Sequence, residues 1–264
     1  MSEKEIVLVT GCSNGIGREL CKTLSARGYR VIATARNLET IKELPSLLKL
    51  KLDVTDRQSI YTAINEIRKQ YKKINILINN AGCSVRGAVE EVDLDSVKNI
   101  FDINVLGVIR MVQACLPLIP EDKSGRIINI GSISGRFVQP VNGAYCATKY
   151  AVEAITETLR IELRKKNIQV SVVEPGPVKT GFFPAMEKRS EKTVTNKKSR
   201  YKDFYLKDSE RKENQKTASP VSAAEEIARI LTRKRLKIRY KVCVPFAYRV
   251  FMGLPDSLRE NIMS

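Results

Sequence analysis

The chain contains no histidine. This absence excludes serine–histidine and cysteine–histidine nucleophilic catalysis, histidine-ligated metal sites and acid–base chemistry by imidazole. Proton transfer in this protein must therefore use tyrosine, lysine, aspartate, glutamate, cysteine or bound water.

Closely spaced cysteines are also lacking. The six cysteines are scattered along 264 residues, without a C-x-x-C pair. Zinc sites need close ligand pairs, and disulfide frameworks are typical of short secreted chains. The sequence therefore predicts no metal site and free thiols in a reducing compartment.

Long apolar runs are scarce. No uninterrupted apolar segment approaches the roughly 20 residues that span a bilayer. The first five residues, MSEKE, are polar and unlike a secretory signal. We therefore expect a cytoplasmic protein.

Acidic residues are outnumbered: 29 aspartates and glutamates stand against 46 lysines and arginines, which gives a net charge of +17. This excess fits a nucleic-acid or membrane surface, or a basic background with a phosphate-bearing cofactor. No basic stripe interleaved with aromatic residues supports nucleic-acid binding, so we expect none. Membrane attachment through the basic run 233–241 and the apolar tail 245–264 is an alternative that we do not favour.

Strand-like and helix-like segments alternate through most of the chain. The expected strands are 6–10, 30–34, 48–53, 74–79, 125–132, 168–174 and 241–244. The expected helices are 15–28, 38–47, 56–71, 94–116, 144–166 and 222–232, with Thr55 and Ser222 as caps of the third and the last. This alternation predicts a doubly wound parallel sheet of the Rossmann type, with residues 1–264 as a single domain. The polar segment of about 177–220 interrupts the pattern, and its part 186–216 has few apolar anchors, so we expect a mobile lid.

A glycine-rich turn follows the first expected strand. The segment TGCSNGIG, residues 10–17, leads from that strand directly into a helix. Glycines let the backbone approach a diphosphate, and the helix N-terminus stabilises its negative charge. The spacing G-x-x-x-G-x-G differs from the common G-x-G-x-x-G, but the context predicts a dinucleotide site.

The end of the second strand indicates which dinucleotide is bound. NAD sites usually carry an acidic residue about 20 residues past the glycines. Here the strand runs into Arg36 with no carboxylate. An arginine can pair with the 2′-phosphate, so we predict that NADP(H) is preferred over NAD(H).

A serine, a tyrosine and a lysine form the candidate catalytic set. Ser132 ends a strand, and Tyr145 and Lys149 follow with a spacing that places them on one face of a helix. A nearby ammonium favours phenolate, so we expect Lys149 to lower the pKa of Tyr145. The Y-x-x-x-K pattern alone is common and carries little weight.

Together these segments resemble the short-chain dehydrogenase/reductase family across nearly all of residues 5–250. The matching parts are the cofactor motif 10–17, the adenine-contacting pair Asp53–Val54, the signature 79–82, the tetrad Asn104, Ser132, Tyr145 and Lys149, and the turn Pro175–Gly176. Within the family, the stretches 131–135 and 145–151 with Arg36 most resemble hydroxysteroid and retinol dehydrogenases.

The resemblance implies an oxidoreductase that interconverts a carbonyl and an alcohol by hydride transfer. Tyr145 would donate or accept the proton, and Ser132 would stabilise the substrate oxygen. Lys149 would bind the nicotinamide ribose and Asn104 would position a water. The implied cofactor contacts are Gly11, Ser13, Asn14, Gly15, Ile16, Gly17, Arg36, Asp53, Val54, Asn80, Ala81, Gly82, Tyr145, Lys149, Pro175, Gly176, Val178 and Thr180. Family members are commonly homodimers or homotetramers, which we expect here by analogy.

The substrate is only broadly indicated. Phe182, Phe183 and Met186 begin the lid and suggest an apolar wall, as for a steroid, a retinoid or an acyl chain. Two alternatives stay open: a non-catalytic NADP sensor or scaffold of the same fold, and a membrane-associated lipid carbonyl reductase.

Overall fold

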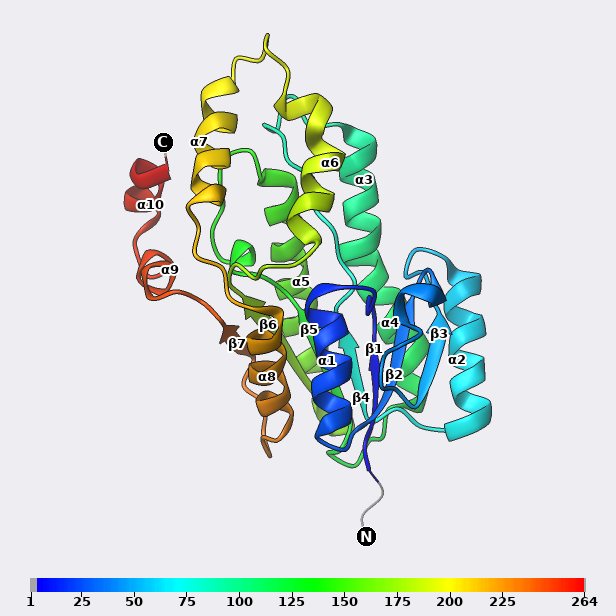
Figure 1. Ribbon diagram of the computed structural model, residues 1–264. Coiled ribbons are helices and arrows are strands. Elements are labelled where there is room, and N and C mark those ends of the chain that lie inside the picture. The colour runs from blue at the N-terminus through cyan, green and yellow to red at the C-terminus, as the bar shows by residue number, and fades with distance from the viewer. Residues whose placement is uncertain (1–3, 264) are drawn as a thin grey trace.

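Seven parallel strands form one sheet in the computed structural model, which describes residues 4–263 (Figure 1). The strands are β1 (Ile6–Val9), β2 (Arg30–Ala35), β3 (Leu48–Lys51), β4 (Ile76–Asn79), β5 (Arg126–Ile130), β6 (Gln169–Pro175) and β7 (Arg239–Val242). Their order is β3-β2-β1-β4-β5-β6-β7, and every neighbouring pair is parallel. The predicted doubly wound sheet is confirmed. Its winding direction changes between β1 and β4, where ligands of such sheets bind beyond the carboxyl ends of the strands.

Helices cover both faces of this sheet. The helices are α1 (Gly15–Ala26), α2 (Arg57–Tyr71), α3 (Leu94–Phe101), α4 (Gly107–Cys115), α5 (Gly143–Glu162), α6 (Phe182–Val194), α7 (Lys202–Glu213), α8 (Pro220–Leu231), α9 (Phe246–Phe251) and α10 (Asp256–Met263). On one face α1 and α8 lie side by side and bury residues such as Leu20 and Ile227 against β1 (Figure 1). On the other face α2 and α4 pack residues such as Ile64 and Met111 against the same strand. Burial from both sides explains why β1 is apolar throughout and β4 is apolar up to Asn79.

The segment 94–118 is a long helix that contains one wider turn. The π-helical residues Asp102–Leu106 separate α3 from α4, and a short 3-10 turn, Leu116–Leu118, follows. By length and composition Leu94–Leu118 is apolar enough to be a candidate membrane span, although the sequence suggested no such run. It packs against α2, α5 and β4, as a core helix does.

Three local predictions were wrong. The segment 38–47 forms only a 3-10 turn, Leu38–Ile41, because Pro45 cannot continue a helix. Helix α2 is capped by Asp56, whose carboxylate accepts from Gln58 N, rather than by the expected Thr55. Helix α8 is capped by Ser219, with a proline at its first position, rather than by Ser222.

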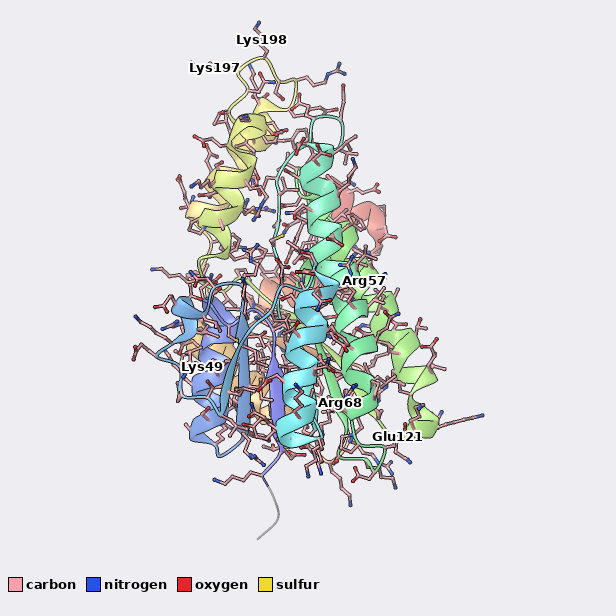
Figure 2. The ribbon with its side chains drawn as sticks, turned by 90° about the vertical axis from the view of Figure 1, so that its right-hand side faces the viewer. Lys49, Arg57, Arg68, Glu121, Lys197 and Lys198 are labelled. Carbon is pink, nitrogen blue, oxygen red and sulfur yellow. The ribbon has the colours of Figure 1, made fainter. Side chains whose placement is uncertain are left out.

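Helices α6 and α7 rise beyond the carboxyl ends of the strands (Figure 1). Two hydroxyl groups attach the segment 186–216, in which few apolar anchors were expected. Tyr205 is buried, and its hydroxyl accepts from Ala88 N and donates to Glu91. The buried Ser190 hydroxyl accepts from Arg86 N. The two helices are therefore fastened to the loop 84–91, while Lys197 and Lys198 between them point outward at the tip (Figure 2).

The apolar tail folds into α9 and α10. The rings of Tyr248 and Phe251 contact Phe137, with centroids 5.9 and 5.1 Å away. Part of the tail is thereby packed onto the segment that follows β5.

Candidate active site

A cleft with a volume of about 400 Å³ lies at the carboxyl ends of the strands. It crosses the point between β1 and β4 where the winding of the sheet changes. Every residue assigned to the site from the sequence lines this cleft, except Gly17 and Asn104. One cavity therefore brings together segments that are up to 170 positions apart in the sequence, from Gly11 to Thr180.

The glycine-rich turn depends on its glycines in two ways. Gly11 and Gly15 have φ angles of +72° and +58°, which other residues adopt only with strain. At Gly17 an added Cβ would lie 2.4 Å from both Gly11 O and Asn80 Nδ2. The close packing of Gly17 against Gly11 and Asn80 therefore leaves no room for a side chain at this position.

Asn80 holds the turn in place. Its Nδ2 donates to Thr10 O at 2.9 Å and to Gly11 O at 3.1 Å. In return, Thr10 Oγ1 accepts from the backbone N–H groups of Asn80 and Ala81, both at 3.0 Å. This bracing role of the Thr10 hydroxyl was not foreseen, because a threonine at a strand end carries no distinctive signal.

The start of α1 fits a dinucleotide diphosphate. Among the described residues no side chain caps its first N–H groups, since Asn14 at the cap position makes no side-chain hydrogen bond there. Uncapped N–H groups at a helix start attract anions. The absence of side chains at Gly11 and Gly15 keeps the approach to these groups open.

Arg36 and Asp53 lie at the opposite end of the cleft from the lid helices. Arg36 follows β2 directly and is exposed to solvent in the cleft. The Asp53 carboxylate is held by its own turn, since it accepts from Thr55 N at 2.9 Å and from Thr55 Oγ1 at 2.7 Å.

Ser132, Tyr145 and Lys149 meet in the middle of the cleft, as predicted. Lys149 Nζ lies 5.7 Å from the centre of the Tyr145 ring and donates to Ile130 O at 2.9 Å. Ser132 Oγ accepts from Ser134 N at 3.1 Å, which orients the hydroxyl. Helix α5 carries the tyrosine and the lysine one turn apart, and the end of β5 presents the serine.

Burial is the largest cause of the pKa shifts of Tyr145 and Lys149. It raises the pKa of the Tyr145 phenol, which the Ser132 hydroxyl lowers only in part. It lowers the pKa of Lys149 to about 8. The direction for Tyr145 is opposite to that expected from Lys149 alone, because desolvation outweighs the attraction of the ammonium in the protein without ligand.

Asn104 lies behind the cleft and is buried. Its Oδ1 accepts from Cys83 N at 2.9 Å, and its Nδ2 donates to Cys83 O at 2.8 Å and to Thr148 Oγ1 at 3.0 Å. The π-helical turn aims this amide at the chain that follows β4. Asn104 thus ties the cleft wall to α5 next to Tyr145.

The substrate end of the cleft is part apolar and part cationic. Phe182 stands 5.7 Å from Tyr145 between ring centres, and Phe183 stands 6.0 Å from Phe182. The expected apolar wall is therefore next to the tyrosine. The sequence did not predict several polar lining residues, which come from the loop after β5, from α6 and α7, from the segment after α7, and from α9: Gln139, Arg189, Arg211, Lys212, Gln215 and Tyr248.

A dinucleotide cleft at the switch point of such a sheet, with serine, tyrosine and lysine at its centre, defines a nicotinamide-dependent oxidoreductase. The chain belongs to the short chain dehydrogenase family, whose model matches residues 5–191.

Two curated relatives extend over nearly the whole chain. A 3-ketodihydrosphingosine reductase of Bacteroides thetaiotaomicron is 32% identical over 263 residues, covering 99% of this chain and 96% of the relative. The human 17-beta-hydroxysteroid dehydrogenase type 1 is 31% identical over 279 residues, covering 99% of this chain and 84% of the relative.

Solved structures share the fold. A short chain dehydrogenase from Burkholderia cenocepacia in complex with NADP has a TM-score of 0.78 at 25% identity, covering 99% of this chain and 98% of its own. One from Burkholderia phymatum in complex with NAD has a TM-score of 0.80 at 22% identity, covering 99% and 96%. A nicotinamide cofactor is common to both, while its phosphorylation differs.

Proposed function

We propose that the protein reduces a carbonyl to an alcohol, or performs the reverse reaction, with NADP(H). The observation that carries the proposal is the convergence of Ser132, Tyr145 and Lys149 on one cleft beside the glycine turn. The bound nicotinamide would supply or accept the hydride. The chain itself has to bind it, orient the carbonyl and move one proton.

Tyr145 moves the proton. Its phenol is the acidic group next to Ser132 in a chain without histidine. The raised pKa keeps this phenol protonated at neutral pH, which is the state that donates to a carbonyl oxygen. Donation to a carbonyl therefore needs no change of pH, whereas alcohol oxidation, which uses the phenolate, should be favoured by a higher pH.

Ser132 and Lys149 support that transfer. The Ser132 hydroxyl would donate to the substrate oxygen while charge develops on it. Lys149 would exchange its bond to Ile130 O for the nicotinamide ribose and favour the phenolate after transfer. Asn104 acts as a positioning residue through Cys83 and Thr148.

The preference for NADP(H) rests on Arg36. Its guanidinium is exposed at the adenosine end of the cleft, where a 2′-phosphate would accept charge-assisted hydrogen bonds. The nearby Asp53 is engaged by Thr55 and is not free to select an unphosphorylated ribose.

The wall of Phe182, Phe183 and Met186 supports an apolar body for the substrate. Two relatives named for a ketosphingoid and for a steroid point the same way. A carbonyl within an acyl, sphingoid or steroid skeleton is therefore the proposed substrate class.

A carbonyl panel with NADPH tests the proposal. The unmodified protein should oxidise NADPH with at least one apolar ketone or aldehyde. Tyr145→Phe should lower that turnover on the order of 10²-fold or more while NADPH still binds, because only the proton-bearing oxygen is lost. Tyr150→Phe is the matched control. Tyr150 lies five residues after Tyr145 on the same helix, is exposed, and does not line the cleft. Near-normal turnover by Tyr145→Phe would overturn the mechanism.

A further inference from the structure

The lid carries a buried cluster in which cations outnumber carboxylates. Asp208 on α7 is 5% exposed and pairs with three cations: Arg86 at 2.5 Å, Lys212 at 2.8 Å, and Arg211. Arg86 is as buried as the aspartate, at 3%. Three positive charges around one negative charge leave an excess of two on this cluster.

This excess is not fully satisfied by the protein. Among the described residues, Arg211 Nε is buried without a hydrogen-bond acceptor, and the buried Lys212 Nζ has no acceptor beyond its ion pair with Asp208. Burial, together with the charges of Arg86 and Arg211, lowers the pKa of Lys212 to about 8 against the pull of Asp208. A buried cation with spare donors is costly unless an anion completes its shell.

Two members of the cluster face the substrate. Arg211 and Lys212 line the cleft, whereas Arg86 and Asp208 lie behind them. Arg211 also donates to Gln139 at 3.4 Å, and Gln139 lies on the loop that leads from Ser132 to Tyr145. The cationic end therefore shares the cavity with the catalytic tyrosine and with the apolar wall of Phe182.

We propose that the substrate carries an acidic group, a carboxylate or a phosphate, at the end away from its carbonyl, and that Arg211 and Lys212 bind this group. The inference rests on the proposed function and deepens it. The carbonyl lies against Ser132 and Tyr145, the apolar body lies along Phe182 and Phe183, and the anion meets the spare donors of the lid. A substrate that ends in an amine is disfavoured, because its ammonium would add a further positive charge.

A ladder of methyl ketones tests the assignment. Each ketone carries a terminal carboxylate, phosphate, primary amide or amine on an alkyl chain of about 4 to 12 methylenes. With NADPH, the acid of the fitting length should have a kcat/KM at least about tenfold above the amide of equal length. The better of the carboxylate and phosphate arms identifies the anion.

Substitutions in the cleft locate the anion site. Lys212→Met and Arg211→Met should each lower the ratio of acid to amide kcat/KM by about tenfold. Lys216→Met, a matched loss of an exposed charge four residues along that does not line the cleft, should leave the ratio unchanged. The ratio is independent of the folded fraction, since misfolding lowers both numbers equally.

Three results separate the inference from the proposed function. Equal or better turnover of amides or amines at every chain length would overturn the anion site. A preference for acids that survives both Met variants would also overturn it. If no ketone is reduced, the proposed function fails. Calorimetry with alkanoates and alkanamides of the same lengths then tests the anion site on its own. Tighter binding of alkanoates that Lys212→Met abolishes supports the site, and equal binding of both refutes it.

Discussion

Asp208→Asn is expected to destabilise the fold strongly. Asp208 supplies the negative charge at the centre of the cluster of Arg86, Arg211 and Lys212. The asparagine keeps the shape of the side chain but leaves the buried Arg86 guanidinium without its counter-ion. Removing one partner of a buried ion pair typically costs about 3 to 5 kcal/mol.

In a chain of this length that loss corresponds to a melting temperature lower by about 6 to 20 °C. Urea unfolding followed by circular dichroism measures the free energy directly. Asp203→Asn is the control, since Asp203 is an exposed acid in the first turn of the same helix and should cost no more than about 1 kcal/mol. A loss of less than about 1 kcal/mol for Asp208→Asn would refute the view that this carboxylate balances buried charge.

Three further outcomes are expected. Arg36→Asp should reverse the cofactor preference by repelling the 2′-phosphate, and equal affinities of the unmodified protein for NADPH and NADH in calorimetry would contradict the role of Arg36. Alcohol oxidation should rise with pH and still be rising at pH 10, the ordinary pKa of tyrosine, because the raised pKa of Tyr145 delays phenolate formation; a plateau at neutral pH would contradict this. Burial and the neighbouring Glu153 raise the pKa of Glu174 from 4.5 to about 7, so the folded state retains a proton that the unfolded state has lost, and stability should fall as pH rises through this window. Glu174→Gln should flatten that dependence in urea unfolding at pH 5 and pH 8 by about 1 to 3 kcal/mol, whereas an unchanged slope would refute the assignment.

The sequence was informative wherever local pattern and chemistry coincide. Alternating apolar strands and helices predicted the parallel sheet, and the spacing of Tyr145 and Lys149 predicted their shared helix face. The glycines of the turn after β1 predicted a close approach of backbone segments. The structure confirms it, because a Cβ atom at Gly11 or Gly17 would lie within 3 Å of neighbouring atoms. Cytoplasmic location and assembly into homodimers or homotetramers stay predictions.

The sequence failed where long-range packing decides. The lid seemed loosely anchored because its attachment uses single residues, such as Tyr205 and Ser190, against a loop more than 100 positions earlier. The direction of the Tyr145 pKa shift depends on desolvation, which no spacing reveals. Likewise, the ion pair of Asp208 with Arg86 joins separate parts of the chain and has no signature in either.

The hydrogen bond between Gln215 and Tyr248 belongs to a part of the cleft that is built from the last third of the chain. Gln215 Nε2 donates to the Tyr248 hydroxyl at 2.6 Å, and both side chains line the cleft. The family model ends at residue 191, so these two residues, together with Arg211 and Lys212, lie beyond the part of the chain that it matches. Exchanging residues from about 200 onward for those of a relative would therefore replace the cationic end of the cleft and leave the catalytic residues and the wall of Phe182 and Phe183 in place, so a chimera can separate these two contributions to substrate choice.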